Sequence, residues 1–171
     1  MTLNATKSRI GWWGTVAVLV AVPVFLFQLA PAGSSGSQIT RGEFGVFAPF
    51  ANDARFEHLQ GHAQMVRAAD GKTIVKVNVT GLVPGITYPV HVHAAACGDN
   101  SAGGHYQFNS AGPVDNLNEI WPGFTTNAAG AGNGTAVADR TAGAGAVSVV
   151  IHTPPVPPAT AAPKVACADL Q

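Results

Sequence analysis

Apolar and polar residues alternate along several short stretches of the chain. The clearest stretch is 74–80, where valine occupies every second position from Val75 to Val79 and polar residues lie between. Because successive side chains of a strand point to opposite faces, this pattern predicts a half-buried β-strand. Similar patterns predict further strands near 63–65, 86–93, 135–139 and 147–152.

Turn residues separate these stretches, and helical periodicity is missing from them. Asp70-Gly71, Pro84-Gly85 and Asn133-Gly134 are predicted turns between strands. Short strands joined by Gly- and Pro-rich connections are typical of all-β proteins. The sequence therefore predicts an antiparallel β-sandwich or Greek-key β-barrel of immunoglobulin-like architecture.

The first residues of the chain have the features of an export signal. Lys7 and Arg9 precede an apolar run over 10–30, and Ala30-Pro31-Ala32 resembles a cleavage site. The run is also close to the length of a membrane-spanning helix. Residues 1–32 are thus predicted to form an apolar export helix, either a cleaved signal peptide or a retained signal anchor that tethers the chain to the membrane through 10–30. Either way the rest of the protein is expected outside the cytoplasm, secreted or held at the outer face of the membrane.

Composition divides the remainder into a tether and one domain. Residues 33–55 begin with a Gly/Ser-rich segment and are otherwise unassigned, and the β domain is expected over 56–171. The 171-residue chain is 47% hydrophobic and 11% charged, which fits one core. It has no excess of basic residues, so we expect no nucleic-acid partner. The sequence does not indicate whether the protein forms an oligomer.

Two cysteines, Cys97 and Cys167, are the only ones in the chain. A cysteine pair in an exported protein forms a disulfide by default. Metal binding through the thiols is the alternative, but Cys97 has no second cysteine near it and Cys167 has no histidine near it. A disulfide between them would fix the loop that follows His93 and tie it to the end of the connection 153–163.

Four of the six histidines fall in or beside predicted β structure: His91, His93, His105 and His152. The first two are separated by one valine, so both imidazoles lie on one face of a strand while the valines face the core. The other two come from distant segments and can complete a metal site. His58 and His62 share a face of a strand, but nothing else indicates a site there, so we predict surface residues.

In their order and spacing, several motifs resemble the copper/zinc superoxide dismutase family. The motifs are Val83-Pro84-Gly85-Ile86, His91-Val92-His93, Cys97, Gly103-Gly104-His105-Tyr106, Val149-Val150-Ile151-His152 and Lys164-Val165-Ala166-Cys167. The resemblance covers roughly residues 57 to 169. It implies a Greek-key β-barrel with its metal site on the outer face, and it gives the copper-ligand role to the four histidines listed above.

The resemblance breaks at the zinc site. In zinc-bearing members the ligand matching His105 bridges the two metals, and the following loop adds two histidines and an aspartate. Here no histidine lies between His105 and His152, and the matching stretch reads Asn118-Glu119-Ile120-Trp121. The carboxylate that links the two sites in such members is replaced by Val156. The chain therefore resembles a copper-only member, with zinc binding not expected.

Three further residues are candidates for the chemistry. His105 is expected to shuttle a proton, and Glu119 is our candidate partner for its second ring nitrogen, with Asp115 behind it. The family places an arginine three residues before the second cysteine, and Lys164 occupies that position. We expect Lys164 to attract the superoxide anion without the planar fork of arginine. Tyr106 and Trp121 are expected to be packing residues.

Three classes of function fit these patterns. The first is an antioxidant enzyme, an exported copper-dependent superoxide dismutase that converts superoxide to dioxygen and hydrogen peroxide. The second is an extracytoplasmic copper-binding protein on the same fold with little or no turnover. The third is a β-sandwich surface module without metal. The histidines disfavour the third class, and fold alone does not decide between the other two.

Overall fold

The valines of the alternating stretch are buried, as the pattern predicts. In a computed structural model that describes residues 1–2, 36–154 and 162–171, Val75, Val77 and Val79 are at most 3% exposed. Lys76 and Asn78, between them, are exposed. All three valines belong to one strand, which confirms the strand predicted at 74–80.

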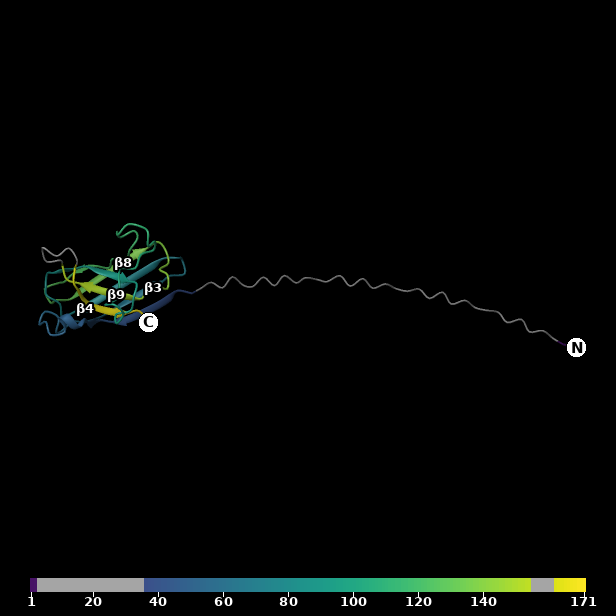
Figure 1. Cartoon of the computed structure of the whole chain (residues 1–171), viewed down its shortest axis with the longest axis horizontal. Coiled ribbons are helices and arrows are strands. Elements are labelled where there is room, and N and C mark those ends of the chain that lie inside the picture. The colour runs from purple at the N-terminus through teal and green to yellow at the C-terminus, as the bar shows by residue number, and fades with distance from the viewer. Residues whose placement is uncertain (3–35, 155–161) are drawn as a thin grey trace. The chain divides into compact units, whose positions relative to one another are not determined.

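The described residues form ten strands and one short 3-10 helix. In chain order these are β1 (Gln38–Glu43), β2 (Gly45–Val46), η1 (Ala48–Phe50), β3 (Gln60–Arg67), β4 (Thr73–Thr80), β5 (Thr87–Tyr88), β6 (Val90–His93), β7 (Phe124–Thr125), β8 (Gly132–Ala138), β9 (Ser148–His152) and β10 (Lys164–Asp169). The predicted all-β class is therefore confirmed (Figure 1). The predicted export helix lies outside the described residues, among which no helix is long and apolar enough to cross a membrane.

The strands form two four-stranded sheets and one short pair. One sheet has the order β1-β3-β4-β8, the other has the order β2-β10-β9-β6, and β5 pairs with β7. All pairings are antiparallel. The sandwich prediction is confirmed, but the described strands do not form the closed barrel that was its alternative, because β8 and β6 remain sheet edges.

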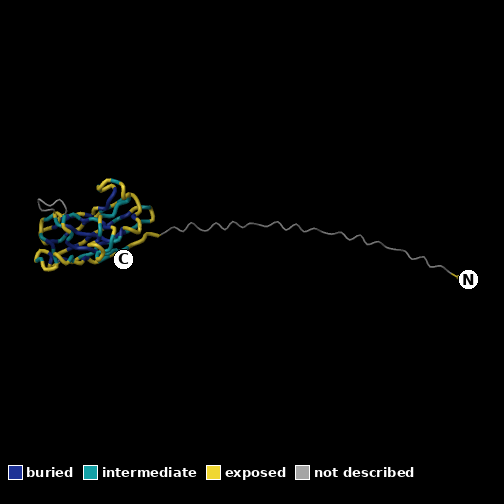
Figure 2. The backbone as a smooth tube through the Cα atoms, in the orientation of Figure 1, coloured by how far each residue is buried: buried dark blue, intermediate teal, exposed yellow. Residues whose placement is uncertain are grey.

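Both sheets bury apolar side chains between them, and the backbone tube in Figure 2 is dark blue where residues are buried. Strand β9 is buried along its whole length. Its inner residues Val149 and Ile151 join the main core, whereas Val150 on the other face packs with Ala102 and Cys167. The continuous apolar run of β9 thus reflects burial on both faces. The loop after β6 covers the outer face of β9, where its residue Ala102 lies against Val150.

The folded unit begins earlier than residue 56, the boundary expected from the sequence. Strand β1 pairs with β3 along its full length, and β2 pairs with β10. Phe44, between these two short strands, is buried in the main core. The segment predicted as an unassigned linker therefore contributes a strand to each sheet. The described residues from 36 onward belong to one compact unit.

Two of the three predicted turns are present. Gly71 and Gly85 have positive φ, which several types of tight turn require. The turn predicted at Asn133-Gly134 is wrong, because both residues lie inside β8. Gly134 is needed there for close approach, since a Cβ would lie 1.9 Å from the carbonyl oxygen of Pro122.

The strand predicted at 86–93 is divided at Pro89. Proline has no N–H to donate to a sheet, and here it separates β5 from β6. The short β5 pairs with β7, and β6 joins the edge of the second sheet. The residues that follow β6 form the long connection to β7, in which His105 and Glu119 lie.

Candidate metal centre

Strand β6 places two histidines together on its outer side. Val90 and Val92 are at most 1% exposed and belong to the main core. His91 and His93 alternate with them and lie opposite Val150 and Ser148 of β9. His93 is completely buried. The predicted division of β6 into a core face and a histidine face is confirmed.

The other two histidines reach the same place from different segments. His105 forms an isolated β-bridge with His93, and the backbone N–H of Ala94 donates to the carbonyl oxygen of Gly104 at 3.0 Å. The loop between β6 and His105 is therefore closed at its base. His152 ends β9, where its backbone N–H donates to the carbonyl oxygen of Pro89 at 2.9 Å.

The four histidines form one cluster. Each offers a ring nitrogen, and these four atoms all lie within 4.8 Å of one another. The ring centroids of His91 and His105 are 4.0 Å apart, and those of His93 and His152 are 5.4 Å apart. His58 and His62 are not part of this cluster. The structure thus brings together the four residues expected from the sequence, in a group that could hold a metal ion.

Hydrogen bonds fix the tautomers of two of these rings. His93 Nδ1 lies 3.2 Å from the carbonyl oxygen of Ala102 and 3.3 Å from that of Gly103, and His152 Nδ1 lies 3.0 Å from that of Ala162. A carbonyl oxygen only accepts, so both Nδ1 atoms carry the proton. In the neutral rings the Nε2 atoms then hold lone pairs.

Those lone pairs face one another. The Nε2 atoms of His93 and His152 are 3.3 Å apart inside the protein. Two acceptors at that distance repel unless a proton or a cation lies between them. In addition, His91 Nδ1 is buried and has no hydrogen-bond partner, although buried polar atoms are normally paired. These unpaired nitrogens fit a metal ion better than they fit an empty core.

Burial keeps three of the four imidazoles neutral. Loss of hydration, and secondarily the charges that neighbouring histidines would carry, lowers the pKa of His91 and of His93 to about 3. Burial also lowers the pKa of His152. These three imidazoles are uncharged at neutral pH, which is the form that binds metals.

Glu119 is the partner of His105, as expected. Its Oε2 lies 2.7 Å from His105 Nδ1, and the residue is 2% exposed. Gln107 Nε2 donates to Oε1 at 3.1 Å, and Trp121 Nε1 donates to Oε2 at 2.8 Å. Asp115 does not support Glu119 through its carboxylate, which instead accepts the backbone N–H of Leu117 and of Asn118. The aspartate therefore shapes the turn before Glu119.

Trp121 was expected only to pack, and the structure gives it a second contact. Besides its bond to Glu119, its ring lies edge-on to His91 with centroids 5.5 Å apart. The sequence contains one signal for this role. Glu119 and Trp121 are two positions apart, so an extended chain places them on one side.

Lys164 lies beside the cluster. It is the cross-strand neighbour of His152. Its Nζ donates to the carbonyl oxygens of Ser101 and Gly103, at 2.7 Å and 2.5 Å. Burial lowers the pKa of this ammonium group. The expected positive charge is present near the histidines, but it is hydrogen-bonded to the loop.

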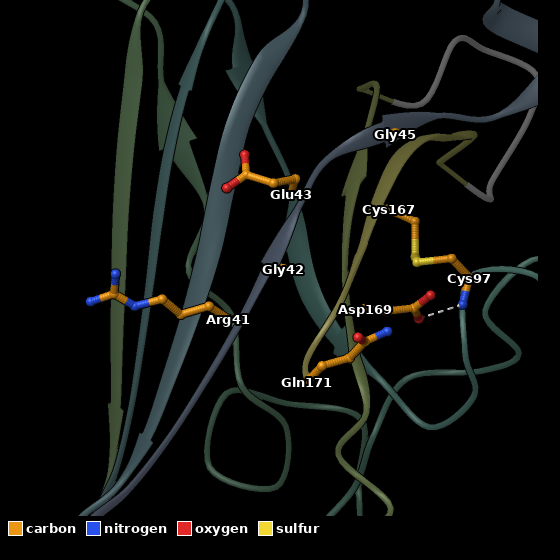
Figure 3. A pocket seen from close by; sticks show the side chains of 8 residues that line it. All are labelled: Arg41, Gly42, Glu43, Gly45, Cys97, Cys167, Asp169 and Gln171. Carbon is orange, nitrogen blue, oxygen red and sulfur yellow. Dashed lines mark hydrogen bonds between the residues drawn. A yellow bond between two sulfur atoms is a disulfide. The ribbon is translucent and has the colours of Figure 1, made fainter.

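Cys97 and Cys167 form the predicted disulfide, with Cα atoms 5.7 Å apart. Their sulfurs are therefore not available as thiolate ligands. Asp169 accepts the backbone N–H of Cys97 at 2.8 Å (Figure 3). A pocket of about 560 Å³ opens beside the disulfide and is lined by Arg41 and Glu43 as well. None of the four clustered histidines lines this pocket.

Comparison with known proteins gives no family assignment. No family model matches the chain. No curated protein matches it either.

Proposed function

We propose that the protein is an exported, copper-dependent superoxide dismutase, a distant copper-only relative of the family that its motifs resemble. The observation that carries this proposal is the convergence of four imidazoles whose free nitrogens face a common point. No carboxylate or thiolate belongs to that cluster. An all-imidazole site suits copper, which also has the highest affinity among divalent first-row metals for such ligands.

Copper held by His91, His93, His105 and His152 would supply one-electron chemistry, in which one superoxide is oxidised to dioxygen and a second is reduced to hydrogen peroxide. Reduction of the second superoxide to hydrogen peroxide consumes two protons. His105 can deliver one, because its side chain is 29% exposed whereas His93 and His152 are buried.

Glu119 determines how His105 performs this task. Its buried carboxylate accepts the Nδ1 proton of His105, which leaves Nε2 facing the cluster. A His105 ring whose Nε2 is free could take a proton there from water, and the Glu119 carboxylate would stabilise the resulting imidazolium. The proton would then lie on the side of His105 that faces the histidine cluster.

The same hydrogen bond argues against a bridged zinc ion. A second metal bound through His105 would need the Nδ1 atom that Glu119 occupies at 2.7 Å. The other residue expected to distinguish this chain from zinc-bearing members, Val156, lies outside the described residues. The proposed centre therefore holds copper alone.

Lys164 provides positive charge for the substrate in this proposal. The ammonium group lies close enough to His93 and His152 to disfavour their protonation. Superoxide is a small anion, so a point charge near the metal is sufficient to attract it.

One observation favours the second candidate, a copper-binding protein with little turnover. Both short contacts of Lys164 Nζ are to backbone carbonyl oxygens, so these dipoles partly offset its positive charge. A weaker field at the metal would slow the capture of superoxide while leaving copper affinity intact. The disulfide is typical of extracytoplasmic proteins, and both candidates are proposed to act outside the cytoplasm.

Pulse radiolysis of the copper-loaded full-length protein tests the proposal. The rate of superoxide decay should increase in proportion to the concentration of copper-loaded protein. His105→Ala should lose most of this acceleration, whereas His62→Ala, on β3 and outside the cluster, is the matched control and should keep it. Stoichiometric copper without acceleration would favour the binding protein, and absence of copper binding would remove both candidates.

A further inference from the structure

The loop between β6 and His105 contains an unusual run of backbone conformations. Asn100, Ser101 and Ala102 have φ values of 46°, 50° and 66°, and Gly103 follows with 60°. Only glycine adopts this left-handed region at no cost, and three consecutive residues with side chains in it are rare. Such a segment persists only where the surroundings hold it.

The carbonyl groups of this segment point at two side chains. His93 Nδ1 donates to the carbonyl oxygens of Ala102 and Gly103. Lys164 Nζ donates to the carbonyl oxygens of Ser101 and Gly103. Gly103 is therefore shared between the lysine and the histidine. The left-handed run is what turns three successive carbonyls toward them.

Strand β10 supplies three anchors to this loop. Cys167 holds it through the disulfide, Asp169 accepts the N–H of Cys97, and Lys164 binds its far end (Figure 3 shows the first two). Within the run itself, one backbone hydrogen bond is present, from the N–H of Gly103 to the carbonyl oxygen of Asn100. Ala102 is completely buried, so it cannot move outward without exposing apolar surface.

We infer that Lys164 is a positioning residue that clamps the left-handed loop 100–103 and thereby fixes the tautomer and orientation of His93. An ammonium group has three donors and no acceptor, so it can hold two carbonyls at once. With the lysine removed, the carbonyls of Ser101 and Gly103 lose a charge-assisted partner. His93 Nδ1 then loses its fixed acceptors, so the proton can move to Nε2, which no longer keeps its lone pair free to bind metal.

The effect on copper rests on the proposed function, but the clamp itself does not. It can be measured in the metal-free, disulfide-bonded, full-length protein. In the wild type, nitrogen–proton correlation spectra of His93 should show the Nδ1–H tautomer alone. In Lys164→Met a second tautomer should become visible, and the amide of Gly103 should exchange at least tenfold faster. Lys76→Met, an exposed lysine on β4, is the matched control and should change neither.

Lys164→Arg separates the charge-assisted bonds from mere side-chain bulk. Arginine keeps the donors, so it should retain the Gly103 protection and the single His93 tautomer to a greater degree than methionine. If Lys164→Met leaves both signals unchanged, or if arginine is as disruptive as methionine, the clamp is overturned.

Copper affinity is the second readout. Changes that free a ligand's hydrogen-bond partner typically weaken metal binding by about 10–100-fold, and Lys164→Met should show a loss in that range by competition with a chelator. If the wild type binds no copper, the metal-centre proposal fails, while the tautomer and exchange measurements still decide whether the clamp exists.

Discussion

The position of single protons decides what the histidine cluster can do. Three rings direct Nδ1 toward an oxygen atom, from Ala102 and Gly103, from Ala162 or from Glu119. Their Nε2 atoms are left to face inward. His91 differs, because its buried Nδ1 has no partner. We therefore expect one ligand to bind through Nδ1 and three through Nε2.

Replacing the buried carboxylate should separate metal binding from turnover. Glu119→Gln keeps the shape but removes the charge and one of the acceptors that face His105, Gln107 and Trp121. We expect stoichiometric copper with dismutation slowed about tenfold or more, in the range that general acid–base groups contribute. Metal analysis and pulse radiolysis on one sample measure both. Glu57→Gln, at an exposed position, is the control, and turnover equal to wild type in both variants would remove Glu119 from the mechanism.

Acid should destabilise the metal-free protein in a defined window. The pKa of His91 and of His93 is about 3 when folded, against about 6.5 when unfolded. Below pH 6.5 the unfolded chain binds protons that the folded chain does not, so stability falls as pH falls. Each histidine contributes a slope of at most about 1.4 kcal/mol per pH unit.

Urea unfolding of the metal-free protein between pH 7 and 5 measures this slope above the range in which ordinary carboxylates titrate. A free energy of unfolding that stays constant over that range would show that these histidines are not buried as described.

At the level of elements, β10 joins the sandwich to the loop that carries His105 of the histidine cluster. It pairs with β9 and β2, and its side chains hold the loop after β6 at three points. The sequence separation of 70 between Cys97 and Cys167 makes the disulfide a long-range constraint. Loop and sheet should therefore lose order together when it is removed.

Removing the disulfide should cost much of the stability. We expect Cys97→Ala combined with Cys167→Ala to lower the free energy of unfolding by about 2–5 kcal/mol. Urea titration of the double variant against the oxidised wild type gives the difference. The reduced wild type should resemble the variant. A difference below the error of the titration would mean that the hydrogen bonds of Asp169 and Lys164 hold the loop without help.

A glycine substitution tests the contact of β1 with β10. A Cβ at Gly42 would lie 1.9 Å from the carbonyl oxygen of Asp169, whereas a Cβ at Gly45 would meet nothing within 4 Å. Gly42→Ala should therefore destabilise the domain by about 1–3 kcal/mol, and Gly45→Ala by much less. Thermal unfolding of both variants measures this. Equal effects would contradict the assignment of β1 to the folded unit.

At the scale of the whole molecule, the sequence predicted the strands that are marked by a local alternation of apolar and polar residues. The strand alternation around Val77 and around Val92 is local, so it located both β4 and the histidine face of β6. Strand β1 was missed because it is a sheet edge with mostly exposed residues, so no alternation of apolar side chains marks it. The turn expected at Asn133-Gly134 failed because the glycine serves a tertiary contact.

The members of the histidine cluster were predictable from the sequence, and the contacts that support them were less so. Spacing and resemblance indicated the four histidines, the disulfide and Glu119. They did not indicate that Trp121 and Gln107 bind the same carboxylate, or that Lys164 bonds to a left-handed loop. Those contacts depend on how distant segments meet, which periodicity does not report.

A single copper centre is tested by the metal content of the full-length protein after loading with copper and zinc together, measured with the Cu(II) electron paramagnetic resonance spectrum of the same sample. We expect one copper and no zinc per chain, with nitrogen couplings from several imidazoles. His91→Ala should alter that spectrum, and His62→Ala should not. No stoichiometric metal, or zinc bound alongside copper, would contradict a single copper centre built from these four histidines.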